Sequence, residues 1–243
     1  MILILTSSPC RDGESRICRD NGLMETLWRC VKTGARTLFV SADPDDEPFS
    51  DYCASSMYAS MTESGLELGP YLSLDSRTKR KTASLVSRSD FIVIGGGHVP
   101  TQNAFLSEIG LRDHIRQFTG TVMGISAGSM NCADIVYAQP EEPGESIDPN
   151  YIRFLKGLGL TKINILPHYQ KTHDLMLDGQ RLYEDITFGD SHGHAFYAFP
   201  DGTYLLSENG RETIFGDAWL IQNGHIRKIC SQDKACHLPS SSQ

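Results

Sequence analysis

The residues best suited to do chemistry are a serine between two glycines. Gly124–Gly128 reads Gly-Ile-Ser-Ala-Gly and matches the Gly-x-Ser-x-Gly pattern of a nucleophile elbow. The pattern follows the apolar run Thr121–Ile125 and precedes Ala127–Ala133, which is the strand-turn-helix order that an elbow requires. The first N–H groups of a helix favour a developing negative charge. The pattern therefore predicts Ser126 as a nucleophile, and the alternative is a turn in which Ser126 only caps the helix.

A run of three glycines ends another apolar segment. Phe91–Ile94 is followed by Gly95–Gly97 and then by His98. Two interpretations stay open: the loop binds a nucleotide phosphate, or it forms the second wall of an oxyanion hole. The dinucleotide pattern Gly-x-Gly-x-x-Gly is incomplete here. As an oxyanion hole, the loop would supply the N–H of Gly97 opposite that of Ala127, with His98 lining the pocket.

A serine hydroxyl needs a base at neutral pH, and the chain has eight histidines. His168 follows the buried run Ile163–Leu166 and Pro167, at the position where the sites of α/β proteins lie. His192 and His194, beside Asp190, are an alternative as a metal pair, although a lone His-x-His is more typical of a loop. We therefore expect His168 to be the base, and we expect no metal and no cofactor.

Alternating patterns surround these residues. Strands buried on both faces are predicted at Ile2–Leu5, Thr37–Val40, Phe91–Ile94, Thr121–Ile125 and Ile163–Leu166. Helices are predicted at Glu47–Met61, Lys79–Ser87, Asn103–Gln117 and Asp174–Ile186. This alternation predicts an α/β fold with a mostly parallel sheet and helices on both faces.

The pattern changes after His194. Short strands are expected at Ala195–Phe199, Thr203–Leu206, Thr213–Phe215, Trp219–Gln222 and Ile226–Ile229, with hairpin signals at Asp201-Gly202, Asn209-Gly210 and Asn223-Gly224. We therefore expect an antiparallel extension over about 195–235. Gln139–Asn150 reads as a Pro/Gly-containing acidic loop, and 237–243 as a frayed tail. Without a linker or repeat, residues 1–243 are predicted to form one domain.

Composition narrows the possible partners. The chain has 243 residues, 40% of them hydrophobic, with 22 Lys and Arg against 30 Asp and Glu, for a net charge of −8. These values are those of a globular protein, and the acidic balance argues against nucleic acid as a partner. We expect no membrane span, because no window is apolar enough. Seven scattered cysteines and the absence of a basic start before the first apolar run predict a cytoplasmic protein with free thiols. The oligomeric state is not predicted.

Three motifs in order resemble a known family. They are Val93-Ile94-Gly95-Gly96-Gly97, the Gly124–Gly128 elbow and Pro167-His168-Tyr169, after a short apolar N-terminal strand. Together they resemble the peptidase E family of serine peptidases, which includes the aspartyl dipeptidases and is related to the cyanophycinases. The resemblance runs from Met1 to about Thr203. It implies a fold like the class I glutamine amidotransferases, which is flavodoxin-like, with serine in place of cysteine. It also implies Ser126 as nucleophile, His168 as base, and Gly97 with Ala127 as the oxyanion hole.

The resemblance also implies an acid that orients the histidine. The family's spacing puts this acid at Glu141, where it would hold the tautomer of His168. Glu142, Asp134 and Glu145 remain rivals, because an acidic loop of this composition is often only solvated surface.

The chain departs from the aspartyl dipeptidases where they set specificity. Arg181 matches the last residue of their Glu-Thr-Arg stretch, but Gln180 replaces the threonine, and Asp201 stands where they carry the glutamate of Pro-Glu-Gly. We name His98, Arg181 and Asp201 as candidate substrate contacts. Since the retained features are incomplete and the surroundings are acidic, we expect dipeptides that begin with Asp to be poor substrates.

These observations predict a serine peptidase or amidohydrolase that cleaves a small peptide or amide through an acyl-enzyme on Ser126. One alternative is an esterase-like enzyme that acts on an ester or a modified amino acid. Another is a catalytically silent protein that binds a small ligand in the same pocket. A third is nucleotide binding at Gly95–Gly97.

Overall fold

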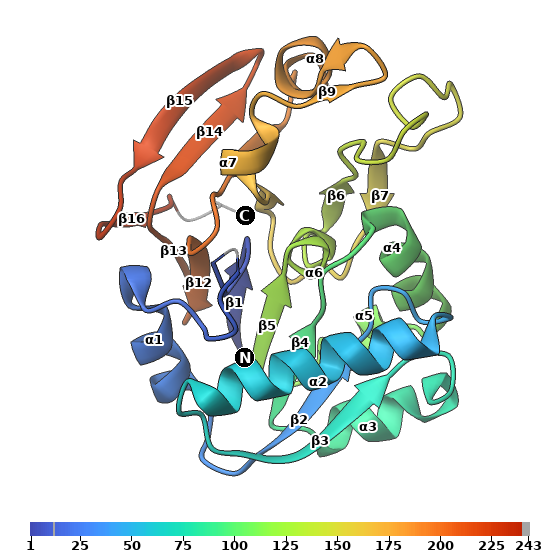
Figure 1. Ribbon diagram of the computed structural model, residues 1–243, viewed down its shortest axis with the longest axis vertical. Helices are drawn as coiled ribbons and strands as arrows, with labels where there is room; N and C mark the ends of the chain where they lie inside the picture. Colours follow the sequence, from blue (N-terminus) through green and yellow to red (C-terminus); the bar gives the residue numbers. More distant parts are fainter. Residues whose placement is uncertain (12, 240–243) are drawn as a thin grey trace.

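The computed structural model describes residues 1–11 and 13–239, whose strands and helices form an α/β architecture (Figure 1). In that part of the chain the main sheet has eight strands in the order β16-β13-β12-β1-β5-β4-β2-β3. The five strands from β1 to β3 pair in parallel. They are β1 (Ile2–Thr6), β5 (Thr121–Ile125), β4 (Phe91–Ile94), β2 (Ala35–Val40) and β3 (Leu68–Leu74).

Helices cover both faces of this sheet because its central strands are apolar on both sides. Successive strand residues point to opposite faces, so Leu3 and Leu5 join one core cluster and Ile4 the other. The first cluster includes α3 (Thr82–Arg88), α4 (Val99–Glu108) and α5 (Leu111–Ile115), and the second includes α1 (Leu23–Cys30) and α2 (Glu47–Glu63). The predicted mostly parallel sheet with helices on both faces is confirmed.

The C-terminal strands are divided between two sheets. β12 (Tyr204–Glu208), β13 (Arg211–Phe215) and β16 (Ala235–His237) extend the main sheet antiparallel from β1. A second sheet has the order β15-β14-β11-β8, formed by β15 (His225–Cys230), β14 (Ala218–Gln222), β11 (Ala195–Ala198) and β8 (Asn164–Leu166). The predicted antiparallel strands and the hairpins at Asn209-Gly210 and Asn223-Gly224 are confirmed, since all four turn residues have positive φ. β11, however, pairs in parallel with β8.

Asp201-Gly202 is not the predicted hairpin turn. The strands on either side of it, β11 and β12, lie in different sheets, so this turn carries the chain from one sheet to the other. Of the predicted tail 237–243, His237 belongs to β16, and residues 240–243 lie outside the described residues.

Two predicted helices are also corrected. Asn103–Gln117 is broken into α4 and α5 at Gly110, whose φ of 60° is left-handed. Asp174–Ile186 begins instead with a two-stranded hairpin of β9 (Met176–Leu177) and β10 (Gln180–Arg181), because Asp178 and Gly179 have φ of 50° and 80°. The helical stretches on either side are α7 (Tyr169–Thr172), a π-helical segment (Leu182–Thr187) and α8 (Phe188–Asp190).

The sequence patterns also left some elements unpredicted. They are the parallel edge strand β3, the helix α1, the short 3-10 turn Asp20–Gly22, and the antiparallel pair β6 (Ile135–Tyr137) and β7 (Phe154–Lys156). The predicted helix Lys79–Ser87 begins with a 3-10 turn, Lys79–Lys81, which leads into α3. Among the described residues, no helix is both long and apolar enough to cross a membrane.

Candidate active site

Ser126 stands on a sharp turn between β5 and the short helix α6 (Ala127–Asn131). Its φ of 50° and ψ of −115° are strained for an L-residue. The surrounding structure holds this conformation, because the Ser126 N–H donates to the carbonyl oxygens of Thr6 and Ser7 at 3.1 and 3.0 Å. The expected tight packing of the elbow is also present, since a Cβ on Gly128 would lie 2.2 Å from the carbonyl oxygen of Ile94. The sequence-predicted strand-turn-helix context is confirmed.

His168 follows β8 and faces the elbow. Its Nε2 lies 2.9 Å from Ser126 Oγ. Its backbone is left-handed, with φ 57° and ψ 32°, at the start of α7. Its N–H donates to Ser7 Oγ at 2.7 Å, so the end of β1 helps to fix this unusual conformation. In Figure 1, β1 and β5 lie side by side and run towards α7 and α6. The carboxyl ends of these strands therefore position both side chains.

Asp201 completes a chain of three side chains. Its Oδ1 lies 2.7 Å from His168 Nδ1 and also accepts a hydrogen bond from Ser7 Oγ at 2.9 Å. Its Oδ2 accepts one from Gln170 Nε2 at 2.6 Å, and its side chain is only 7% exposed. Burial alone would raise the pKa of Asp201, but its interactions with His168, Ser7 and Gln170 lower that pKa to about 2. The carboxylate is therefore ionised beside the imidazole.

The expected pairing of Glu141 with His168 is corrected by this geometry. Both ring nitrogens of His168 have other partners, and Glu141 Oε1 instead accepts a hydrogen bond from the Val99 N–H at 3.1 Å. Burial of this carboxyl raises the pKa of Glu141 above its ordinary value. One rival acid, Asp134, pairs with Arg112 at 2.5 Å. Asp201, predicted as a substrate contact, takes the position that was expected for Glu141.

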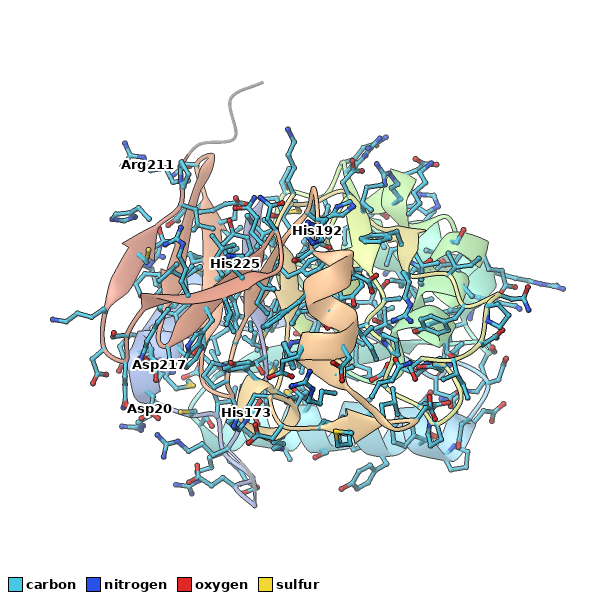
Figure 2. The ribbon with its side chains drawn as sticks, turned by 90° about the horizontal axis from the view of Figure 1, so that it is seen from above. Asp20, His173, His192, Arg211, Asp217 and His225 are labelled. Carbon is cyan, nitrogen blue, oxygen red and sulfur yellow. The ribbon has the colours of Figure 1, made fainter. Side chains whose placement is uncertain are left out.

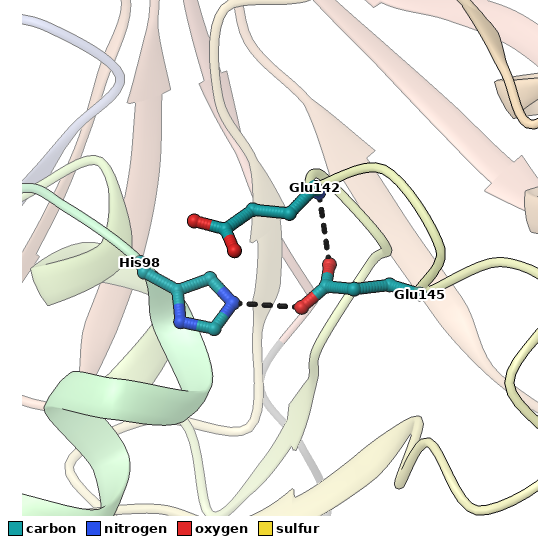
Figure 3. A group of neighbouring side chains, drawn as sticks. All are labelled: His98, Glu142 and Glu145. Carbon is teal, nitrogen blue, oxygen red and sulfur yellow. Dashed lines mark hydrogen bonds and ion pairs between the residues drawn. The ribbon is translucent and has the colours of Figure 1, made fainter.

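His98 and the other two rival acids form a separate cluster. His98 Nε2 lies 2.8 Å from Glu145 Oε1 (Figure 3). Its Nδ1 lies 2.7 Å from Thr101 Oγ1. Glu145 Oε2 accepts the N–H groups of Glu141 and Glu142 within the acidic loop, and its contact with His98 joins that loop to the start of α4. His98, Glu142 and Glu145 place ligand-type atoms within 4.8 Å of one another. Hydrogen bonds already satisfy the Glu145 carboxylate, so we interpret the cluster as a structural contact that holds the acidic loop in place rather than as a metal site.

The predicted cation and the alternative metal pair lie elsewhere. Arg181 is 57% exposed and pairs with Asp185 at 2.6 Å. The ring of His192 lies beside the turn between β14 and β15, on the side of the molecule where Figure 2 labels His192 and His225. The ring of His194 stacks on that of Phe154, with 4.4 Å between the ring centroids. Asp190, the acid next to the two histidines in the sequence, accepts a hydrogen bond from the Tyr137 hydroxyl at 2.8 Å.

A cavity of about 70 Å³ opens beside the nucleophile. Its lining combines the glycine loop, the elbow, the acidic loop and the segment after β8. The lining residues are Gly97, Val99, Ser126, Met130, Gln139, Pro140, Glu141, Pro167, His168, Thr172, Leu175 and Leu182. Neither His98 nor Arg181 is among them.

The glycine loop is crowded by protein atoms. A Cβ on Gly95, Gly96 or Gly97 would lie 2.7 Å from Phe39, 3.2 Å from Ser126 and 2.6 Å from Ala42, respectively. These neighbours account for the three glycines without a nucleotide phosphate. Gly97 lines the same cavity as Ser126.

Two residues of the site were not predicted from the sequence. They are the buried Ser7, which bonds to His168 and Asp201, and Gln170, which bonds to Asp201. Ser7 follows the first buried strand directly, at the carboxyl end where sites of α/β proteins lie, and that position was the available signal. Asp201 does carry a signal, its place in Pro200-Asp201-Gly202, but that pattern predicts a hairpin turn and the family resemblance a substrate contact. No sequence signal of its own marks Gln170.

Comparisons with known proteins identify the family and the fold of the chain. Residues 15–215 match the model of peptidase family S51. The fold is similar to that of a peptidase from an acI-B1 actinobacterium, with a TM-score of 0.70, 16% identity and coverage of 98% of this chain and 96% of that one. It is also similar to a protein assigned as peptidase E from Listeria monocytogenes EGD-e, with a TM-score of 0.60, 16% identity and coverage of 94% and 98%. No curated protein sequence matches the chain.

Proposed function

Since the chain belongs to peptidase family S51, we propose that it is a serine-type peptidase that hydrolyses a small peptide or amide through an acyl-enzyme on Ser126. The observation that carries this proposal is the continuous chain from Ser126 Oγ to His168 Nε2, at 2.9 Å, and from His168 Nδ1 to Asp201 Oδ1, at 2.7 Å. The proposed reaction needs no cofactor. We also propose a cytoplasmic location, which the seven free cysteines support.

The proposed reaction begins when Ser126 Oγ attacks the substrate carbonyl and His168 Nε2 accepts its proton. Asp201 keeps the proton of the neutral imidazole on Nδ1 and stabilises the imidazolium that forms. The carbonyl oxygen becomes negative and is bound by the N–H groups of Gly97 and Ala127. His168 then donates the proton to the leaving amine. Water, activated by the same imidazole, hydrolyses the ester on Ser126 and releases the acid product.

Labelling with a fluorophosphonate tests this proposal, because only an activated serine reacts with such a probe. We expect one adduct per chain, located on Ser126 by peptide mass spectrometry. Ser126→Ala should abolish the adduct and the hydrolysis of a dipeptide and amino-acid-amide panel. Ser8→Ala is the matched control, since among the described residues the Ser8 hydroxyl bonds only to the nearby Cys10 backbone. An unlabelled wild type, or an adduct that persists in Ser126→Ala, would contradict the proposal and favour a silent binding protein.

A further inference from the structure

The cavity beside Ser126 is mostly apolar with one carboxylate. Val99, Met130 and Leu182 are among its buried walls. Apart from His168, Glu141 is the one titratable residue of the lining, and the lining set contains neither Lys nor Arg. A ligand in this cavity therefore meets a negative charge next to the reacting serine.

Among the described residues, the Glu141 carboxylate forms no ion pair with a Lys, Arg or His side chain. Its Oε1 accepts the Val99 N–H, and within the described residues its Oε2 has no hydrogen-bond partner and no Lys, Arg or His nitrogen lies within 4.0 Å of its carboxylate. Glu145 differs, because His98 and two N–H groups satisfy its carboxylate. Glu141 is an exposed residue, so its carboxylate is open to a ligand, and a cationic group can form a charge-assisted hydrogen bond with Oε2.

We propose that Glu141 binds the free α-ammonium group of the substrate, so that the enzyme releases a small, uncharged N-terminal residue. This inference rests on the proposed function. A single Cα separates an α-ammonium from the carbonyl that Ser126 attacks, so both groups fit a short cavity. A lysine side chain would bring a second ammonium, for which the apolar walls Val99, Met130 and Leu182 offer no partner.

The same arrangement disfavours an acidic N-terminal residue. Its side-chain carboxylate would lie near Glu141, and no cation of the cavity lining would offset the repulsion. Arg181, the cation that an acidic substrate would need, is paired with Asp185 and is not part of the lining. Binding of the ammonium also leaves Ser126, His168 and Asp201 in their proposed roles.

The test compares substrates that differ only in the ammonium group. The wild-type enzyme is assayed with alanine p-nitroanilide and with N-acetylalanine p-nitroanilide, and then with the Asp and Lys p-nitroanilides. We expect kcat/KM for the free alanine compound to exceed that for the acetylated one by about 10- to 100-fold, the range for one hydrogen bond to a charged group. The Asp and Lys compounds should be poorer than the alanine compound.

Glu141→Gln should remove this preference. We expect kcat/KM for the free alanine compound to fall about 10-fold or more, mainly through KM, while the acetylated compound changes far less. Glu142→Gln is the matched control, with the same loss of charge one residue away and outside the cavity lining. If Glu141 had only a structural role, Glu141→Gln would lower kcat/KM equally for both substrates, and the ratio of the two values would not change.

The outcomes separate this inference from the proposed function. If Ser126 takes the fluorophosphonate but the wild type treats free and acetylated substrates alike, only the ammonium site is wrong. The same holds if Glu141→Gln keeps the wild-type ratio, or if the Lys compound is the best substrate. If the wild type takes no label on Ser126 and cleaves none of the compounds, the proposed function itself fails.

Discussion

Asp201 is the residue on which the proposed mechanism depends beyond the serine and histidine. Replacing it with asparagine removes the charge that holds the His168 tautomer, so Asp201→Asn should lower kcat by about 10²- to 10⁴-fold with little change in KM. Steady-state kinetics on the best substrate of the panel measure this. Asp217→Asn is the control, because Asp217 pairs with Lys228 away from the site. A D201N enzyme with wild-type kcat would remove Asp201 from the mechanism.

Ser7 is a positioning residue for the same pair. Its buried hydroxyl accepts the His168 N–H and donates to Asp201 Oδ1. Ser7→Ala leaves the His168 N–H without this acceptor, so it should lower the free energy of unfolding by about 1–3 kcal/mol. It should also lower kcat more than it changes KM, which a purely structural defect would not do. Urea unfolding and kinetics check both effects, and a variant with wild-type kcat would show that Ser7 does not position the imidazole.

At the scale of elements, the elbow depends on the contact between α6 and β4. A Cβ on Gly128 would lie 2.2 Å from the Ile94 carbonyl oxygen, so Gly128→Ala must move one element away from the other. We expect a loss of about 1–3 kcal/mol or more in the free energy of unfolding. Gly189→Ala is the control, because nothing lies within 4 Å of its added Cβ, and it should change stability by less than about 0.5 kcal/mol. Equal effects in urea unfolding would contradict this account.

Local signals explain which elements could be predicted. β4 and β5 were predicted with the bounds that the structure has, because each is a short apolar run next to glycines. The hairpin at Asp178-Gly179 was missed because the surrounding apolar residues also fit a helical spacing. The same dipeptide predicts a hairpin at 201–202, where the chain instead passes from one sheet to the other. Sequence patterns do not distinguish these two uses of Asp-Gly, because the distinction lies in which strands pair.

The same limit applies to the site. Ser126 and His168 each carry a local signal, a glycine elbow and a position after a buried strand. The approach of Asp201 to His168 joins residues 33 positions apart and depends on how β8, β11 and β12 are arranged. Family spacing pointed to Glu141, which does reach the same cavity but contacts Val99.

At the scale of the whole molecule, Asp201 links the site to acid stability. Its carboxyl has a pKa of about 2 in the folded protein, against an ordinary value of 3.8, so the folded state binds this proton less readily than the unfolded state. The resulting stability is fully present above about pH 4 and is lost as pH falls towards 2; for this shift it is on the order of 2 kcal/mol. Urea unfolding between pH 5 and 2.5 should show a shallower fall in Asp201→Asn. Parallel curves for the two proteins would contradict this.

In this account Ser126, His168 and Asp201 together make the serine a nucleophile, whereas Glu141 binds the α-ammonium group of the substrate. The rate at which a neutral fluorophosphonate labels Ser126 tests it most directly, because the probe needs an activated serine but carries no ammonium group. We predict that Asp201→Asn slows labelling by more than about 100-fold, and that Glu141→Gln slows it far less. Slower labelling in Glu141→Gln than in Asp201→Asn would contradict the account and restore Glu141 as the partner of the histidine.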